Sequence, residues 1–245
     1  YQHLTIKQGD SSMDELFMKE GFKQSSLWQT TTVDLTKGQS FLWNQLKNNA
    51  KGPIEQARKY DVRVYAGESY EDMDTFYNIF FQTRKALGIP TFGRSFFKKI
   101  WYTMCLTQKA KLFLAKKGDL TLAGVILLFH KNIVIEGYAA SFSKHRHLRA
   151  NDLLIWESLK WSIEQGYSSF DFGADSREQK GLLAFKRKFN GVHKTLKHYF
   201  LLNKCKKINE MDSSSKKYYF IRRILSKLPS PLFSQISNRI VSYFG

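Results

Sequence analysis

Hydrophobic side chains recur at helical spacing most clearly in residues 69–88. The apolar positions fall on one face of a helix: Met73, Phe76, Phe80 and Leu87. Ser69 stands where an N-cap is expected, and Gly88 follows the last apolar position. The spacing therefore predicts a helix over 69–88.

Strand-like patterns dominate from residue 109 onward. Three apolar runs lie within 110–141, with turn residues at 118–119 and 131–132 between them. The middle run, LTLAGVILLFH, is apolar almost throughout, as in a central strand with both faces covered. These runs predict three consecutive strands.

Helices and strands are expected to alternate after these three strands. A helix, a strand, a helix and a strand are expected at 151–166, 167–173, 176–191 and 195–203. Asn151 is the expected N-cap of the first helix, and Asp175 or Ser176 of the second. The order β-β-β-α-β-α-β predicts an α/β (α+β) fold: a mixed sheet with flanking helices and crossover connections.

The N-terminal part of the chain is less regular. Residues 1–24 are polar and poorly patterned, and Ser40 is the expected N-cap of a short helix. Pro53 suits the first turn of another helix. Strands are expected at 26–35 and 61–67, and a further helix at 93–106.

Composition adds a packed core and a strong positive charge. Of 245 residues, 42% are hydrophobic, which excludes a disordered chain, and the net charge is +18. That excess favours an anionic partner such as RNA, a phosphorylated lipid, a membrane surface or a phosphate-bearing cofactor. The alternative is a soluble protein that is merely basic.

Few other features restrict the class of protein. No run approaches the ~20 apolar residues of a membrane span. The chain starts at Tyr1 without a leader pattern, so we expect no signal peptide and interpret the chain as a piece of a longer protein. Cys105 and Cys205 form no paired motif, which indicates a reducing compartment and no zinc site.

The last 42 residues have a separate character. Residues 204–245 contain nine Lys or Arg against Glu210 and Asp212, and two apolar stripes. The stripes are Ile221, Ile224, Leu225 and Leu228, then Phe233, Ile236, Ile240 and Phe244. Such a basic amphipathic tail fits an anionic membrane surface. The alternative is that it packs against protein.

Three segments of the chain resemble one family. They are GYAASFSKHRHLRANDLLIWESLKWSIEQGY, FDFGADSREQKGLLAFKRKF and GFKQSSLWQTTTVDL with the region up to RKYDVRV. Together with the element order, they resemble the Fem-type (FemAB-like, BioF2-like) branch of the GCN5-related N-acyltransferase (GNAT) superfamily, over roughly residues 20–203. The resemblance divides the chain into 1–60, a remnant of an N-terminal half-domain, 61–203, a GNAT-like transferase domain, and the tail 204–245.

The resemblance implies an enzyme that forms an amide bond by transferring an acyl or aminoacyl group to an amine on a cell-envelope precursor. Acyl-CoA or aminoacyl-tRNA would be the co-substrate, with no permanently bound cofactor and no metal. The expected location is cytoplasmic, peripheral on the inner membrane face. The net charge of +18 and the absence of glycines from the loop SKHRHLRAN favour tRNA as the carrier of the donor group. The single compact transferase half favours acyl-CoA instead.

The motif match makes Lys186, in AFKRKF, the candidate that stabilises transition-state charge. Asp171, in FDFG at a strand end, is the candidate base or a residue that orients one. The alternatives are a solvated lysine on an amphipathic helix and a carboxylate held by backbone N–H groups. The candidate substrate-binding residues are Tyr138, Ser141, Gly173, Arg177 and Phe185.

The loop SKHRHLRAN precedes a helix N-terminus, a natural anion site. Acyl-CoA enzymes of the superfamily carry R/Q-x-x-G-x-G/A there, but Arg149 and Asn151 occupy the two glycine positions here. The candidate donor-binding residues are Lys144, Arg146, Arg149 and Asn151. The competing interpretation of the whole chain is a non-catalytic GNAT-fold module that binds RNA or an anionic membrane.

Overall fold

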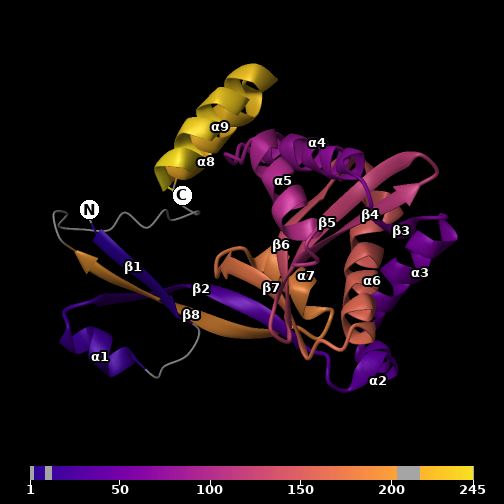
Figure 1. Cartoon of the computed structure of the whole chain (residues 1–245), viewed down its shortest axis with the longest axis horizontal. Helices are drawn as coiled ribbons and strands as arrows, with labels where there is room; N and C mark the ends of the chain where they lie inside the picture. Colours follow the sequence, from indigo (N-terminus) through magenta and orange to yellow (C-terminus); the bar gives the residue numbers. More distant parts are fainter. Residues whose placement is uncertain (1–2, 9–12, 203–215, 245) are drawn as a thin grey trace.

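The structure of the chain, a computed structural model, describes residues 3–8, 13–202 and 216–244 (Figure 1). Within these residues, eight strands form one sheet in the order β1-β8-β2-β7-β6-β5-β4-β3. The strands are β1 (His3–Gln8), β2 (Lys23–Asp34), β3 (Arg63–Ala66), β4 (Ala110–Lys117), β5 (Leu120–His130), β6 (Ile133–Ser141), β7 (Ser169–Ser176) and β8 (Val192–Leu202). Only β6 and β7 pair in parallel among these strands.

Helices cover both faces of the sheet (Figure 1). They are α1 (Asp14–Lys19), α2 (Gly38–Gln45), α3 (Asn48–Lys59), α4 (Tyr70–Leu87), α5 (Arg94–Ile100), α6 (Ala150–Glu164), α7 (Lys180–Arg187), α8 (Lys216–Lys227) and α9 (Ser230–Phe244). The order β4-β5-β6-α6-β7-α7-β8 confirms the expected β-β-β-α-β-α-β pattern. As a crossover helix must, α6 connects the two parallel strands.

The sheet separates two hydrophobic cores. One lies under α2, α3 and α6 and contains Ile54, Trp156 and Val125. The other lies under α4 and α5 and contains Phe76, Phe97 and Ile126. Strand β5 contributes to both cores, which confirms it as the central apolar strand with both faces covered.

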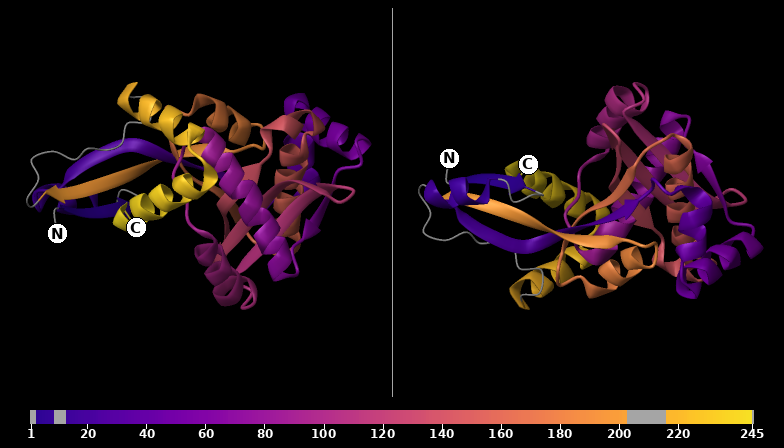
Figure 2. Two further views of the ribbon diagram at one scale, coloured as in Figure 1. Left: turned by 90° about the horizontal axis from the view of Figure 1, so that it is seen from above. Right: turned by 90° about the horizontal axis from the view of Figure 1, so that it is seen from below.

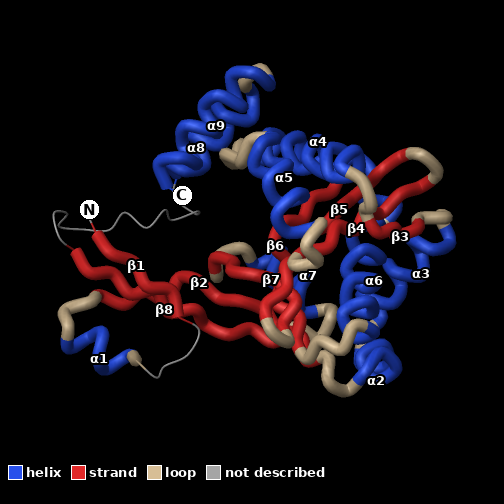
Figure 3. The backbone as a smooth tube through the Cα atoms, viewed as in Figure 1, coloured by secondary structure: helices blue, strands red, loops and turns tan. Residues whose placement is uncertain are grey.

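The strands β1, β2 and β8 extend beyond the helices as an arm with α1 at its far end (Figure 3). Both views in Figure 2 show the same arm. Within the sheet, β2 is hydrogen-bonded to β7 on one side and to β8 on the other. The N-terminal segment thus supplies a central strand of the same sheet, whereas the division at residue 60 into domains stays a prediction.

The best-patterned helix forms as expected. The Ser69 hydroxyl accepts the Asp72 backbone N–H at 3.2 Å, and Gly88 ends α4 in the left-handed conformation with φ 63°. The helix expected over 93–106 continues past α5 as a π-helical turn, Trp101–Cys105. The poorly patterned segment 1–24 contains β1 and α1 in its described part.

Several expected helix starts were wrong. Lys37, not Ser40, precedes α2, and Pro53 lies in the interior of α3 rather than in its first turn. Arg149, not Asn151, is the N-cap of α6. Strand β7 runs on to Ser176, so α7 begins only at Lys180 and neither Asp175 nor Ser176 caps it. Strand pairing with β2 outcompetes the local helical pattern in residues 174–176.

The C-terminal helices pack against α4 through one side. Leu225 and Phe233 are buried, and the Phe233 ring stands edge-on to Phe81 at 5.6 Å between centroids. The Arg222 Nε donates to the Leu87 carbonyl at 2.8 Å. The expected stripe on α8 is therefore divided, because Leu225 faces α4 whereas Ile224 stays 49% exposed. Phe244 lies outside the described side chains.

Candidate functional site

The parallel strands β6 and β7 separate at their carboxyl ends. Residues 133–135 pair with residues 169–171, after which β6 continues to Ser141 while β7 pairs only with β2. The pairing of β6 with β5 also skips Gly137, a β-bulge. Ligands of open α/β sheets collect at the carboxyl ends of strands. We call the gap after Ile135 and Asp171 the split.

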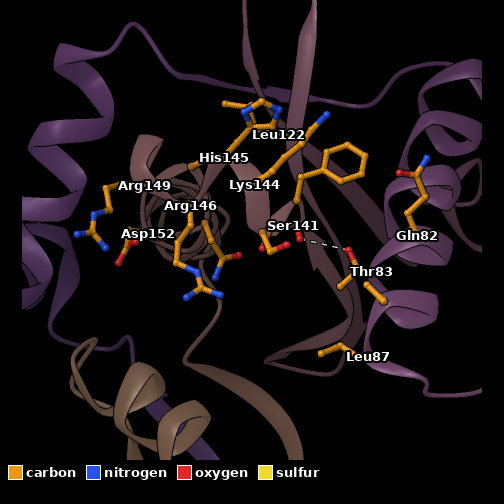
Figure 4. A pocket seen from close by; sticks show the side chains of 15 residues that line it. Gln82, Thr83, Leu87, Leu122, Ser141, Lys144, His145, Arg146, Arg149 and Asp152 are labelled. Atoms are coloured by element: carbon orange, nitrogen blue, oxygen red, sulfur yellow. Dashed lines mark hydrogen bonds between the residues drawn. The ribbon is translucent and has the colours of Figure 1, made fainter. Parts of the chain in front are cut away.

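A pocket of about 450 Å³ opens between α4 and the β6–α6 loop (Figure 4). We call it the loop pocket. Lys144 and Arg146 line it together with Asn151 at the start of α6, and Gln82, Thr83 and Leu87 face them from α4. The Thr83 hydroxyl donates to the Ser141 carbonyl at 3.2 Å and fixes the end of β6 against α4. The loop pocket is thus a basic cavity at a helix N-terminus.

Arg149 occupies the glycine position of the loop with the backbone that glycine favours. Its φ is 55°, in the left-handed region, and it directly precedes α6. Its Nε donates to the Gln56 side chain of α3 at 3.3 Å, so the guanidinium is tied to that helix. The loop therefore retains a left-handed turn before the first N–H groups of α6, which have no partner within the helix.

Lys186 is buried, at 3% exposure, and its ammonium group lies against β7. Its Nζ donates to the Asp175 Oδ2 at 2.5 Å and to the Phe172 carbonyl at 2.7 Å. Burial raises the pKa of Asp175, and the hydrogen bond from Lys186 opposes that rise. The interpretation of Lys186 as a solvated surface lysine was therefore wrong.

Two further carboxylates lie near this ion pair. Asp171 accepts the Gly173 N–H at 2.7 Å and also the Thr30 hydroxyl. Glu136, the first β6 residue beyond the last β6–β7 pair, has a buried Oε2 with no hydrogen bond among the described residues. Burial raises its pKa to about 7, with Lys186 acting in the opposite direction. We call Glu136, Asp171, Asp175 and Lys186 the charge cluster.

A second pocket, of about 630 Å³, lies beside α7. We call it the basic groove. Its lining comes from β2, the α2–α3 connection, α3, α7, the residues that flank α7, and β8: Gln29, Lys47, Asn49, Arg177, Lys180, Leu183, Ala184, Arg187, Lys188 and His193. Lys188 forms a largely buried ion pair with Asp152, which lines the loop pocket. The two pockets therefore share this ion pair as a wall.

The structure brings the candidate residues together in three groups. The loop pocket gathers Ser141, Lys144, Arg146, Arg149 and Asn151. Asp171, Gly173 and Lys186 lie at the charge cluster, and Arg177 lines the basic groove.

Two candidates lie in packed aromatic surroundings instead. Tyr138 packs among Phe80, Phe92, Phe96 and Phe97, and Phe185 packs edge-on against Phe189 at 5.4 Å. Neither Tyr138 nor Phe185 lines either of the two pockets.

Sequence reasoning missed Glu136 and His193, and it gave Asp175 a capping role that the structure contradicts. It expected Lys188 to face solvent or a polyanion, whereas the structure pairs Lys188 with Asp152. Glu136 carried a signal, because it is a lone acid in the apolar run IVIEGYAA directly before a glycine. The described residues hold no group of three or more His, Cys, Asp or Glu side chains that could bind a metal. No helix in the described part of the chain has the length and apolarity of a membrane span.

Residues 44–187 match the acetyltransferase (GNAT) domain family. The fold is similar to the crystal structure of FemX, with a TM-score of 0.69, 16% identity, and coverage of 83% of this chain and 72% of that chain. No match was found among curated proteins.

Two further similar folds are named as lysylphosphatidylglycerol synthetases. The C-terminal domain of a putative one from Agrobacterium fabrum gives a TM-score of 0.60 and 12% identity, covering 81% of this chain and 67% of that one. L-PGS from Bacillus licheniformis gives 0.57 and 13%, covering 91% and 73%. These similarities confirm the expected fold, a mixed sheet flanked by helices.

Proposed function

Because the chain belongs to the acetyltransferase (GNAT) domain family, we propose that it transfers an acyl or aminoacyl group directly to an amine and forms an amide. The observation that carries the proposal is the split, because β6 runs from it past Glu136 of the charge cluster to Ser141, which lines the loop pocket. Two parallel strands that part at their carboxyl ends leave backbone groups free to hold an extended donor between them.

The loop pocket is the proposed donor site. Lys144 and Arg146 supply positive charge, and the first N–H groups of α6 supply hydrogen bonds for a phosphate. The left-handed Arg149 supports this assignment, because the loop keeps its turn without the glycine. Acyl-CoA is the co-substrate that the family implies, and aminoacyl-tRNA is the alternative donor.

The chemistry needs one proton acceptor. The amine nitrogen attacks the carbonyl carbon, a C–N bond forms, and the thiol or ribose oxygen of the donor leaves with a proton. Glu136 is the proposed acceptor of the amine proton, because its pKa of about 7 suits a base near neutral pH. Asp171 is held by Gly173 and Thr30 and is better suited to fixing β7 than to taking a proton.

Lys186 is proposed to act electrostatically, through the positive charge of its ammonium group, on the carbonyl that reacts at the split. Its Nζ already donates to Asp175 and to the Phe172 carbonyl, so it holds β7 in place while it supplies positive potential near the reacting carbonyl. In this assignment Lys186 is a positioning residue that also favours a developing oxyanion.

The proposed acceptor is an amine on a cell-envelope precursor. The names of the lysylphosphatidylglycerol synthetases with this fold support aminoacyl transfer to an envelope component as the form to test first. The proposed location is cytoplasmic, at the inner membrane face.

The outward side of α8 supports a membrane location. Tyr219 and Phe220 are 67% and 64% exposed, and the cations Arg223 and Lys227 lie exposed among these apolar side chains. Aromatic and basic side chains on one helix face suit the surface of an anionic bilayer. The Phe220→Ser/Ile224→Ser variant should lose flotation with phosphatidylglycerol vesicles, whereas Tyr102→Ser/Leu106→Ser, with similar exposure at the π-helical turn, should keep it.

The donor assignment is tested by thermal stabilisation with CoA and, separately, with uncharged tRNA, each at two salt concentrations. A ligand that binds only the folded state raises Tm by mass action. The Lys144→Gln/Arg146→Gln variant should lose the shift, and Lys109→Gln/Lys131→Gln, which removes the same charge at the opposite end of β6, should retain it. A shift that survives equally in both variants would place the donor elsewhere.

The competing proposal is a non-catalytic module that binds RNA or membrane. The occupied glycine positions and the paired state of Lys186 favour it. A discontinuous amide-formation assay with acyl-CoA or aminoacyl-tRNA and small amines separates the two. Amide product that disappears in Glu136→Gln supports the transferase, and binding without any product supports the module.

A further inference from the structure

The basic groove concentrates positive charge without a carboxylate in its lining. Five Lys or Arg residues line it, and no Asp or Glu does. Like charges held together on a folded surface repel one another and raise the free energy of the folded state. A groove of this composition is stabilised when an anion enters it.

Three of these cations have no ion pair among the described residues. They are Lys47, Lys180 and Arg187, and each is exposed. The other two are already held, Lys188 by Asp152 and Arg177 by the Thr195 hydroxyl. The free cations come from the α2–α3 connection and from two turns of α7, so they face the groove from separate elements.

A buried polar atom at the groove also lacks a partner. His193 lines the groove, its Nδ1 lies 2.7 Å from the Thr31 hydroxyl, and its Nε2 is buried without a hydrogen bond among the described residues. When the Thr31 hydroxyl donates to Nδ1, the Nε2 carries hydrogen and becomes a donor. A buried donor without an acceptor is costly, and a bound oxygen would satisfy it.

We propose that the basic groove is an anion site that binds a phosphate or diphosphate group, with Lys180 and Arg187 as its principal side-chain ligands. A diphosphate presents several charged oxygens, which suits a guanidinium fork and two ammonium groups converging from different elements. The volume of about 630 Å³ leaves room for more of the ligand than its phosphates.

This site differs from the proposed donor site. The Lys188–Asp152 ion pair stands between the basic groove and the loop pocket, and the two pockets have no lining residue in common. The phosphate-bearing ligand is therefore assigned to the acceptor, a step that rests on the proposed function. The anion site itself does not depend on that step.

The test is calorimetric titration of the full chain with inorganic pyrophosphate at 0.15 M NaCl. Lys180→Gln/Arg187→Gln should weaken binding about tenfold or more, since it removes two charged ligands. The matched variant Lys109→Gln/Lys131→Gln removes the same charge away from both pockets and should bind within about twofold of the native chain. No binding by the native chain, or equal weakening in both variants, would overturn the proposal.

Two further measurements identify the source of the phosphate and separate the anion site in the basic groove from the proposed donor site in the loop pocket. Because α8 is proposed to bind vesicles by itself, the sources are distinguished by competition: if phosphatidylglycerol vesicles displace pyrophosphate from the Phe220→Ser/Ile224→Ser variant, the ligand is a lipid headgroup, and if they do not, it is a soluble phosphate compound. CoA binding is measured in the native chain and in the same variants. If the native chain binds CoA but not pyrophosphate, the anion site is ruled out and the donor assignment stands. If it binds pyrophosphate but not CoA, the donor assignment is ruled out and the anion site stands.

Discussion

The loop pocket and the basic groove are neighbouring cavities that acquire positive potential in different ways. The loop pocket uses the N-terminus of α6 after a left-handed residue, with Lys144 and Arg146 at its rim. The basic groove relies on side-chain charge from several elements, with no lining carboxylate. Backbone donors stay fixed by the helix, whereas exposed ammonium groups move and are screened by salt. The loop pocket therefore depends mainly on fixed backbone donors, whereas the basic groove depends mainly on side-chain charge. The Lys188–Asp152 ion pair lies between the two pockets.

The largest effect is expected at the buried ion pair between Lys186 and Asp175. Lys186→Met leaves Asp175 buried without its partner and should destabilise the fold by about 3–5 kcal/mol, measured by urea unfolding. The Asp175→Asn/Lys186→Met variant should recover most of that loss, because no charge remains uncompensated. If its activity returns together with its stability, the role of Lys186 is to hold β7, and if activity stays lost, its charge serves the reaction.

Glu136 should make stability fall as the pH rises. Its pKa in the folded chain is about 7 against an ordinary value of 4.5, so the folded state retains a proton that the unfolded state loses between these values. Stability should therefore fall across pH 4.5 to 7, by on the order of 3 kcal/mol, and level off above pH 7.

Glu136→Gln carries no titrating proton and should remove this fall. The measurement is urea unfolding at pH 4.5 and pH 8 for both proteins. In the transfer reaction, kcat/KM of the native chain should rise with an apparent pKa near 7 as Glu136 becomes the carboxylate. An identical pH profile in Glu136→Gln would remove Glu136 from the mechanism.

Salt should separate the two pockets. Raising NaCl from 0.05 to 0.3 M should weaken pyrophosphate binding in the basic groove by about tenfold, because its free cations are exposed. CoA binding in the loop pocket should weaken by only about threefold, because backbone donors contribute there. Calorimetry with pyrophosphate and with CoA measures how each affinity changes with NaCl concentration. An equal salt dependence of the two affinities would contradict the distinction between the two sites.

The smallest effect is expected at Arg149. Arg149→Gly suits the left-handed φ of 55° but loses the hydrogen bond to Gln56, so stability should rise by no more than about 0.5 kcal/mol. CoA binding should stay within about threefold, since the backbone and not the guanidinium defines the loop. A tenfold loss would make the Arg149 side chain a ligand after all.

Glu136 and His193 show why the sequence predicted only part of the candidate site. The loop residues could be named as candidates because they are contiguous in the sequence, and Lys186 because its motif is local. The pKa of Glu136 is raised by burial and by the charges of Asp175 and Asp171 on β7, against the opposing charge of Lys186 on α7. His193 faces the basic groove only because β8 pairs with β2 in a register that places it opposite Thr31.

The sequence by itself determined the order of the secondary elements in residues 110–202, the capped helix α4 and the basic loop before α6, because hydrophobic spacing and caps act over a few residues. Tertiary structure decided that β7 extends to Ser176, that Lys186 pairs with Asp175 and that α8 shares its apolar residues between α4 and solvent. These outcomes depend on strand pairing and burial between segments far apart in the chain, where non-local contacts outweigh local preference.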